Sequence, residues 1–194
     1  MPQRPKGFDC ASTFPAITKI KNRRLRQAVA AVWQRALAES AWKHPADCPF
    51  NPALPDISLM SHVNCLAELA LAAAEVLEKG NPELKLERDH LLAGVFLHDV
   101  SKLVEVEPGP GGRPQFSELS GLMPHAAYGA FLALQEGLNT KVANIILSHS
   151  RLTGAKPATP EAVLLHYLDY GLADVLRAHR RLDLIMLQGP KFGR

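Results

Sequence analysis

The spacing of apolar residues along the chain is predominantly helical. Between residues 15 and 41, apolar side chains recur mostly at the three- and four-residue intervals that place them on one face of a helix. The first fourteen residues lack this pattern and are expected to be irregular. The pattern predicts further helices over residues 56–79, 87–99, 125–136 and 140–150, and from Pro160 into the region of Arg177.

Segments rich in proline and glycine separate these helices. Four prolines between His44 and Asp56 exclude a helix there, and Asp56 is expected to cap the next one. The run from Pro108 to Pro114 is a second strong break. Strand-like alternation is limited to a few residues on either side of that break. The chain is therefore expected to be all-α, a single bundle of about six or seven helices.

Length and composition fit one ordinary domain. The 194 residues are enough for a sizeable core, and 47% are hydrophobic. We expect an N-terminal helical extension and Pro-rich loop over 1–55, the main helical domain over 56–180, and a C-terminal tail over 181–194. The net charge of +3 is small. Its basic runs, Lys19–Arg26 and Arg177–Arg181, are expected to be solvated helix faces rather than nucleic-acid contacts.

Three widely spaced cysteines bear on location. Their odd number argues against a disulfide framework and fits a reducing compartment. The first residues lack the apolar core of a signal peptide, and no uninterrupted apolar stretch approaches the roughly 20 residues that span a bilayer. A cytoplasmic protein without membrane contact is expected, and a homodimer is left open.

The pair His98-Asp99, at the end of an apolar run, is the main candidate for chemistry. A buried carboxylate needs a compensating charge, which a divalent metal supplies while binding both ligand types. Further candidate ligands lie 20 to 36 residues apart, about one helix plus one connection, so each ligand helix can face a common centre. The candidate metal ligands are His62, His98, Asp99, His125, His149 and Asp169.

Six ligands exceed the need of one four-coordinate ion. They suit two divalent ions about 3.5–4 Å apart, with Asp99 as the bridge. His and carboxylate ligands accept Mn, Fe, Co, Ni or Zn, so the identity of the metal stays open. If one ion is bound, His125 or His149 is free to bind phosphate or to protonate a leaving group.

Several motifs carry a family resemblance. His98-Asp99-Val100-Ser101-Lys102 resembles the His-Asp-x-Gly-Lys signature of the HD-domain superfamily of metal-dependent phosphohydrolases, and His125-Ala-Ala-Tyr-Gly129-Ala130 resembles its His-x-x-x-Gly-Ala segment. The closest likeness is to the HD domain of bacterial 3′→5′ exoribonucleases, over 116–125, 147–150 and 160–169. Ser101 replaces the usual Gly, Ser150 replaces a second His, and no OB-fold-like β domain is recognised.

The resemblance implies a metal-dependent phosphohydrolase that cleaves a phosphate mono- or diester of a nucleotide or short oligonucleotide. Asp99, Lys102 and His125 are the catalytic candidates. Substrate contacts are expected from Lys102, Arg113 and His166. Two alternatives stay open: a diiron oxygenase that cleaves a C–P or C–C bond with O₂, and a regulatory module that binds a nucleotide.

Two further expectations concern particular segments. Asp169 is preferred to Asp174 as the ligand because of its Tyr-Leu-Asp context. The loop from Pro108 to Pro124 joins two ligand helices, so it is expected to border the pocket as a lid and to bring Arg113, or groups near Ser117 and Glu118, towards the substrate.

Overall fold

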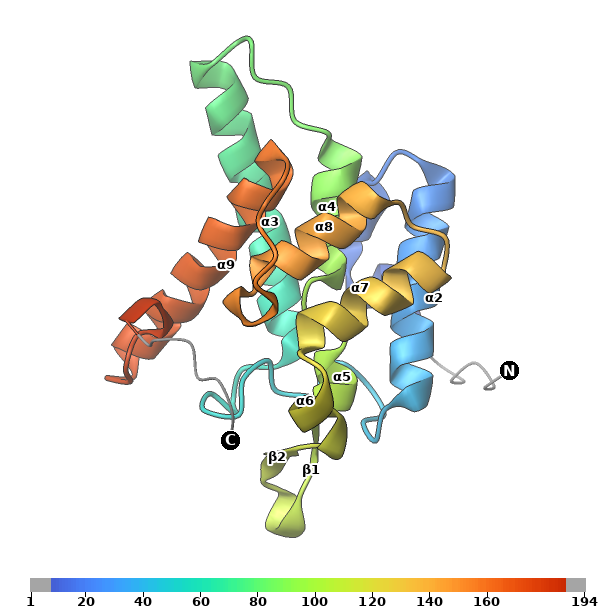
Figure 1. Ribbon diagram of the computed structural model, residues 1–194, viewed down its shortest axis with the longest axis vertical. Helices are drawn as coiled ribbons and strands as arrows, with labels where there is room; N and C mark the ends of the chain where they lie inside the picture. The colour runs from blue at the N-terminus through green and yellow to red at the C-terminus, as the bar shows by residue number, and fades with distance from the viewer. Residues whose placement is uncertain (1–7, 188–194) are drawn as a thin grey trace.

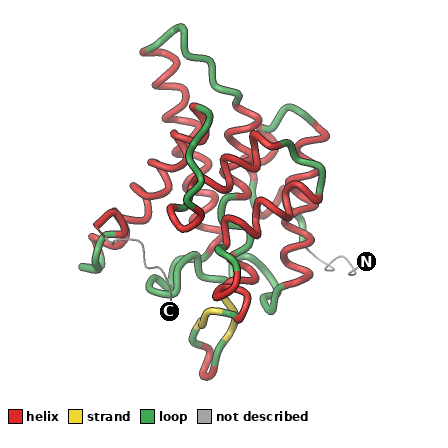
Figure 2. The backbone as a smooth tube through the Cα atoms, viewed as in Figure 1, coloured by secondary structure: helices red, strands yellow, loops and turns green. Residues whose placement is uncertain are grey.

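The computed structural model describes residues 8–187, so the expectations for residues 1–7 and for 188–194 of the tail fall outside it. Six helices of ten residues or more form a bundle, which confirms the predicted all-α class (Figures 1 and 2). They are α2 (Arg23–Glu39), α3 (Leu59–Gly80), α4 (Arg88–Leu97), α7 (His125–Gln135), α8 (Thr140–His149) and α9 (Pro160–His179).

Short elements connect these helices. Three are α-helical turns: α1 (Cys10–Thr13), α5 (Lys102–Glu105) and α6 (Glu118–Leu122). The sheet consists of β1 (Val106–Pro108) and β2 (Pro114–Phe116), which pair antiparallel with Val106 opposite Phe116. The remaining turns are 3₁₀ helices: η1 (Pro15–Lys19), η2 (Pro110–Gly112), η3 (Arg151–Thr153) and η4 (Ile185–Leu187).

Helix α4 is the centre of the core. Every residue from Leu91 to Leu97 is buried, because α2, α3, α8 and α9 all pack around it. Such complete burial explains its weak helical periodicity. Gly94 lets α8 approach, since a Cβ at this position would lie 2.2 Å from Cγ2 of Ile145. The His98-Asp99 pair is thereby held at the end of the most enclosed helix.

The single helix predicted over residues 15–41 is wrong in its first part. The chain forms η1 and then leaves the helical path at Ile20, and α2 begins only at Arg23. The carboxylate of Asp89, on α4, accepts the backbone N–H groups of Lys21 and Asn22 at 2.8 and 2.7 Å. Asn22 caps α2 by accepting from the N–H of Leu25. A bond from a distant residue therefore divides the predicted helix.

The N-terminal region belongs to the same core as the rest of the described chain. The indole N–H of Trp33 donates to the carbonyl of Phe96 at 2.9 Å, and both residues are fully buried. Phe14 packs against both rings. The segment expected to be irregular contains α1, which Asp9 caps through the N–H groups of residues 11 and 12. Residues 8–55 are thus integrated with the helices that carry the ligands.

The expected cap of α3 is also wrong. Ser58 caps this helix by accepting the N–H of Ser61, whereas Asp56 pairs with Arg180 beyond the end of α9. The second basic run is only partly a solvated face, because Arg177 is buried and donates to the carbonyl of Asp183 at 2.6 Å. The Asp56–Arg180 pair joins the end of α9 to the segment before α3, and the Arg177 bond holds the segment that follows α9.

Among residues 8–187, α3 is the helix long and apolar enough to cross a membrane by length and composition. One face of α3 is buried in the bundle and includes His62, Val63 and Leu66. This face makes α3 a core helix in the structure, and its first turn delivers a candidate ligand.

Two glycine substitutions are predicted to change stability in opposite directions. Gly94→Ala should lower the free energy of unfolding by about 1–3 kcal/mol, because the added methyl group meets Ile145. Gly171→Ala, in α9, meets no atom within 4 Å and should raise it by roughly 0.5–1 kcal/mol. Urea unfolding followed by circular dichroism measures both. Equal effects of the two variants would contradict the close packing of α4 on α8.

Candidate metal centre

Two of the candidate histidines end helices and are held in the same way. His98 follows the last residue of α4, and His149 is the last residue of α8. Their Nδ1 atoms lie 2.7 Å from the carbonyl of Val95 and 2.6 Å from that of Ile146. A carbonyl only accepts, so each Nδ1 donates its proton there and each Nε2 faces the other residues of the cluster. Both Nε2 atoms are therefore available to a metal.

The other two histidines begin helices. His125 is the first residue of α7, and its Nδ1 lies 3.1 Å from a carboxylate oxygen of Glu105, which fixes the same tautomer. His62 lies in the first turn of α3 and stacks on Phe50, with ring centroids 4.4 Å apart. Its buried Nδ1 has no hydrogen-bond partner in the described part of the chain.

The four rings form two pairs. The Nε2 atoms of His62 and His98 are 3.2 Å apart, and so are those of His125 and His149. Two imidazoles bound to one ion at about 2.1 Å place their nitrogens about 3.0–3.4 Å apart. Lone pairs that face each other at this distance repel unless a cation or a proton lies between them. The geometry of each pair therefore fits a divalent cation.

The carboxylate of Asp99 lies between the two pairs. Its Oδ2 is 3.4 Å from His98 and 3.7 Å from His62. Its Oδ1 is 3.3 Å from His125 and 3.5 Å from His149. Burial alone would raise the pKa of this carboxyl, but the charges of Lys102 and His98 and the bonds from the other histidines hold it well below its usual range. Asp99 is thus an ionised ligand with one oxygen for each pair.

Asp169 completes the first ligand group, which consists of His62, His98, Asp99 and Asp169. The second ligand group consists of Asp99, His125 and His149. It comes from the middle of α9, and its Oδ1 lies 3.1 Å from Nε2 of His62 and 3.6 Å from that of His98. Burial would lower the pKa of His98, but Asp99 and Asp169 raise it to about 10. Asp174 points elsewhere and accepts the N–H groups of Ile185 and Met186. The structure thus brings together all six residues that the sequence predicts as ligands, and their His and carboxylate donors suit a divalent metal.

Lys102 lies beside the second group. Its ammonium is 3.7 Å from Oδ1 of Asp99 and 3.3 Å from Oε2 of Glu105, and its side chain is 13% exposed. Burial would lower its pKa, but these carboxylates raise it, so the ammonium stays charged. Lysine has three N–H donors, and the hydrogen bond to Glu105 uses one of them, so donors remain for an anionic ligand. Its contact with a substrate stays a prediction.

Glu105 is the residue that sequence reasoning missed. It is 8% exposed, and although burial would raise its pKa, Lys102 and His125 lower it to about 2. The signal in the sequence was an acidic residue between Val104 and Val106, three positions after Lys102. That spacing permits a contact on one helical turn, which the structure shows.

The two departures from the family motifs have structural roles. Ser101 adopts φ −77° and ψ −3°, which any residue tolerates, and its hydroxyl donates to the carbonyl of His125. Gly129 provides room for it, since a Cβ there would lie 3.3 Å from Oγ of Ser101. Ser150 accepts the N–H of Leu152 and begins η3. Both serines therefore fix backbone next to a ligand histidine.

The remaining predicted substrate residues are less closely tied to the cluster. His166 lies one turn before Asp169, with Nδ1 3.0 Å from the carbonyl of Ser148 and its ring beside Tyr170. Arg113 is exposed between the two strands of the hairpin, which projects beyond the helices (Figure 1). The structure does not place Arg113 in contact with a ligand, and both substrate roles stay predictions.

The segment expected to be a lid has more structure than anticipated. It contains β2 and α6, and Ser117 anchors its base through bonds to the carbonyls of Val104 and Glu105.

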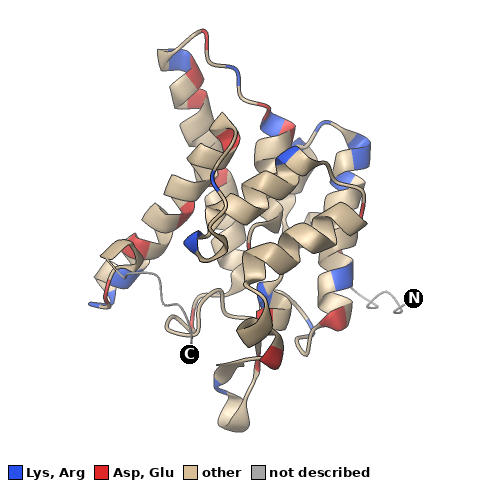
Figure 3. Ribbon diagram, in the orientation of Figure 1, with Lys and Arg blue, Asp and Glu red and all other residues tan. Residues whose placement is uncertain are grey.

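Surface basic residues gather away from the hairpin. Figure 3 shows several at the end of the bundle where α2, α4 and α8 begin, opposite the hairpin. Lys102 is thus a buried cation separate from those surface groups.

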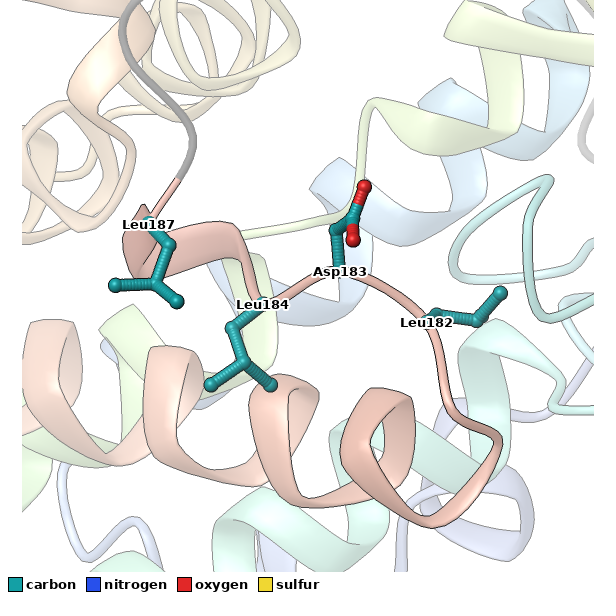
Figure 4. A pocket seen from close by; sticks show the side chains of 4 residues that line it. All are labelled: Leu182, Asp183, Leu184 and Leu187. Atoms are coloured by element: carbon teal, nitrogen blue, oxygen red, sulfur yellow. The ribbon is translucent and has the colours of Figure 1, made fainter.

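A surface hollow lies next to η4. Figure 4 shows its lining side chains, with Leu184 pointing towards α9 and Asp183 pointing away from that helix. The lining is mostly leucine and includes none of the six ligands, so this hollow is distinct from the metal centre.

The division into two groups predicts unequal effects of histidine substitutions. His149→Ala should remove the second group's binding capacity and retain more bound metal than His98→Ala, because Asp169 and the first pair remain in place. Metal-to-protein ratios after dialysis against Mn²⁺ or Co²⁺ measure this. Complete and equal loss in both variants would show a single cooperative site.

The family comparison covers the same residues as the cluster. The model of the HD domain matches residues 61–174, from the first turn of α3 to the C-terminal half of α9. No curated protein and no solved structure matches the chain significantly. The match spans more than half of the 194 residues and includes all six ligands. The chain belongs to the HD domain family.

Proposed function

We propose that this protein is a phosphohydrolase with two divalent cations, which cleaves a phosphate mono- or diester. The observation that carries the proposal is the position of Asp99, whose two oxygens face different histidine pairs at 3.3–3.7 Å. A carboxylate shared in this way is typical of two-metal hydrolytic sites. The six ligands would hold the cations as His62, His98, Asp99 and Asp169 on one side and Asp99, His125 and His149 on the other.

Bound divalent cations supply Lewis acidity and lower the pKa of water, so that hydroxide exists near neutral pH. The chain's own contribution is to position groups around the phosphorus. Lys102 has an N–H donor left for a phosphoryl oxygen, where its charge offsets the charge that develops in the transition state. Burial of the cluster strengthens this interaction because it excludes water. If the second cation is absent, His125 or His149 would bind phosphate or protonate the leaving group.

For the substrate, we propose a nucleotide or a short oligonucleotide. The support is the sequence likeness of residues 147–150 and 160–169 to the HD domain of 3′→5′ exoribonucleases. His166 fits a role in substrate contact because it lies one turn before Asp169 and is only partly buried. A panel of mononucleotides, dinucleotides and short oligonucleotides, incubated with Mn²⁺-, Co²⁺- and Fe²⁺-loaded protein, tests this choice.

Assays on the same metal-loaded protein distinguish the hydrolase from the two alternative functions, an oxygenase and a regulatory module. An HD-type diiron oxygenase would use this ligand set but consume O₂, so an oxygen electrode distinguishes it from a hydrolase. A regulatory module would bind nucleotides without turnover. The complete ligand set favours an enzyme over such a module. Absence of hydrolysis on the whole panel with every metal would overturn the proposed activity.

The shared carboxylate gives the first functional prediction. Asp99→Ala should abolish hydrolysis and lower metal content, because both groups lose a ligand. Phosphate release and metal analysis on the same preparation measure the two effects. Asp183→Asn, in the surface hollow beside η4 that includes none of the six predicted ligands, serves as the control and should keep both. Wild-type turnover of Asp99→Ala with added Mn²⁺ would show the mechanism to be wrong.

The hairpin gives the second functional prediction. Replacing Gly109–Arg113 with a short Gly-Ser linker should raise KM or change substrate preference and leave the metal content unchanged. The reason is that Ser117 anchors the base of the hairpin outside the replaced tip. Steady-state kinetics across the substrate panel measure the effect. Unaltered kinetics would identify the hairpin as a solvated connection without substrate contact.

A further inference from the structure

Glu105 occupies an unusual position in the structure. It is the last residue of α5, six positions after Asp99, and its side chain is 10% exposed. Its two oxygens have different partners: Oε1 lies 3.1 Å from Nδ1 of His125, and Oε2 lies 3.3 Å from Nζ of Lys102. One buried carboxylate therefore contacts both a ligand histidine and the cation beside it.

His125 is held differently from the other ligand histidines. Backbone carbonyls of the preceding helical turn orient His98 and His149, so these bonds persist whatever side chains surround them. His62 is supported by stacking on Phe50. Only His125, among the four, has its Nδ1 bonded to a side-chain carboxylate. The orientation of its Nε2 therefore depends on Glu105.

The charges around the second ligand group also indicate a role for Glu105. Its ligand atoms are one carboxylate oxygen and two imidazole nitrogens, whereas the first group also has Asp169. The ammonium of Lys102 lies 3.7 Å from that single oxygen and would repel a cation bound there. The carboxylate of Glu105 offsets this positive charge at 3.3 Å.

The backbone of Glu105 is fixed on both sides. Its N–H donates to the carbonyl of Ser101, and its carbonyl accepts the N–H of Ser117 at 2.9 Å across the base of the hairpin. Such anchoring holds the carboxylate in place before any ligand binds, as preorganised sites require.

We propose that Glu105 is the positioning residue of the second cation site. It orients Nε2 of His125 through Nδ1 and compensates the charge of Lys102, and without it only the first group retains full affinity. The proposal rests on the two-cation site of the proposed function. A supporting carboxylate behind a ligand histidine typically accounts for 10- to 100-fold in metal affinity.

The test is a Mn²⁺ titration of the metal-depleted full chain. Wild type should bind two ions, with the electron paramagnetic resonance signal of a coupled pair. Glu105→Gln should keep the first ion at wild-type affinity, weaken the second about 10- to 100-fold and lose the coupled signal. Glu105→Asp should recover part of the second affinity. Glu107→Gln, which loses only a contact with Gln115, is the matched control and should equal wild type.

The Lys102→Met background separates orientation from charge. In it, Glu105→Leu should still weaken the second ion relative to Lys102→Met alone, because leucine offers no oxygen to accept the Nδ1–H of His125. Two ions at wild-type affinity in Glu105→Gln, or equal weakening of both, would overturn the proposal. A single ion in wild type would overturn it together with the two-cation site. A wild type that binds two ions but hydrolyses no substrate, together with selective weakening of the second ion in Glu105→Gln, would support the role of Glu105 and refute the proposed activity.

Discussion

The burial of the Asp99 carboxylate constrains the whole molecule. An ionised carboxylate at 3% exposure costs several kcal/mol unless cations and hydrogen bonds surround it. Four histidines and Lys102 lie around this carboxylate, and they come from α3, α5, α7, α8 and the end of α4. The helices must therefore converge on one point, and the packing of the bundle serves that convergence.

The helix ends deliver these groups with little freedom. His98 and His149 each bond back to the carbonyl three residues earlier, while Ser101 ties the turn after Asp99 to the start of α7. Close packing of α4 on α8 at Gly94 brings the two ligand-bearing ends near each other. Rigid placement of this kind favours catalysis and metal selectivity because few side chains must be ordered when ligands bind.

The two ligand groups are supported unequally. The first has two carboxylates and histidines held by the backbone or by stacking, whereas the second has one carboxylate oxygen and a neighbouring ammonium. In the proposed enzyme, this asymmetry gives one tightly held cation and a second whose affinity depends on Glu105. The weaker side is also the side on which Lys102 retains a donor for phosphate.

The sequence determined the helical class and predicted the six residues that converge in the cluster, because periodicity and the His-Asp motifs are local or depend on regular spacing. Tertiary structure decided the rest. The helix breaks at Ile20 because the nearby backbone bonds to Asp89, which lies sixty-seven residues after Asn22. Asp56 does not cap α3 because it pairs with Arg180. Glu105 was missed because a buried acid is recognisable only once its partners His125 and Lys102 are in place. Contacts between distant residues depend on how the helices pack, which spacing along one chain does not specify.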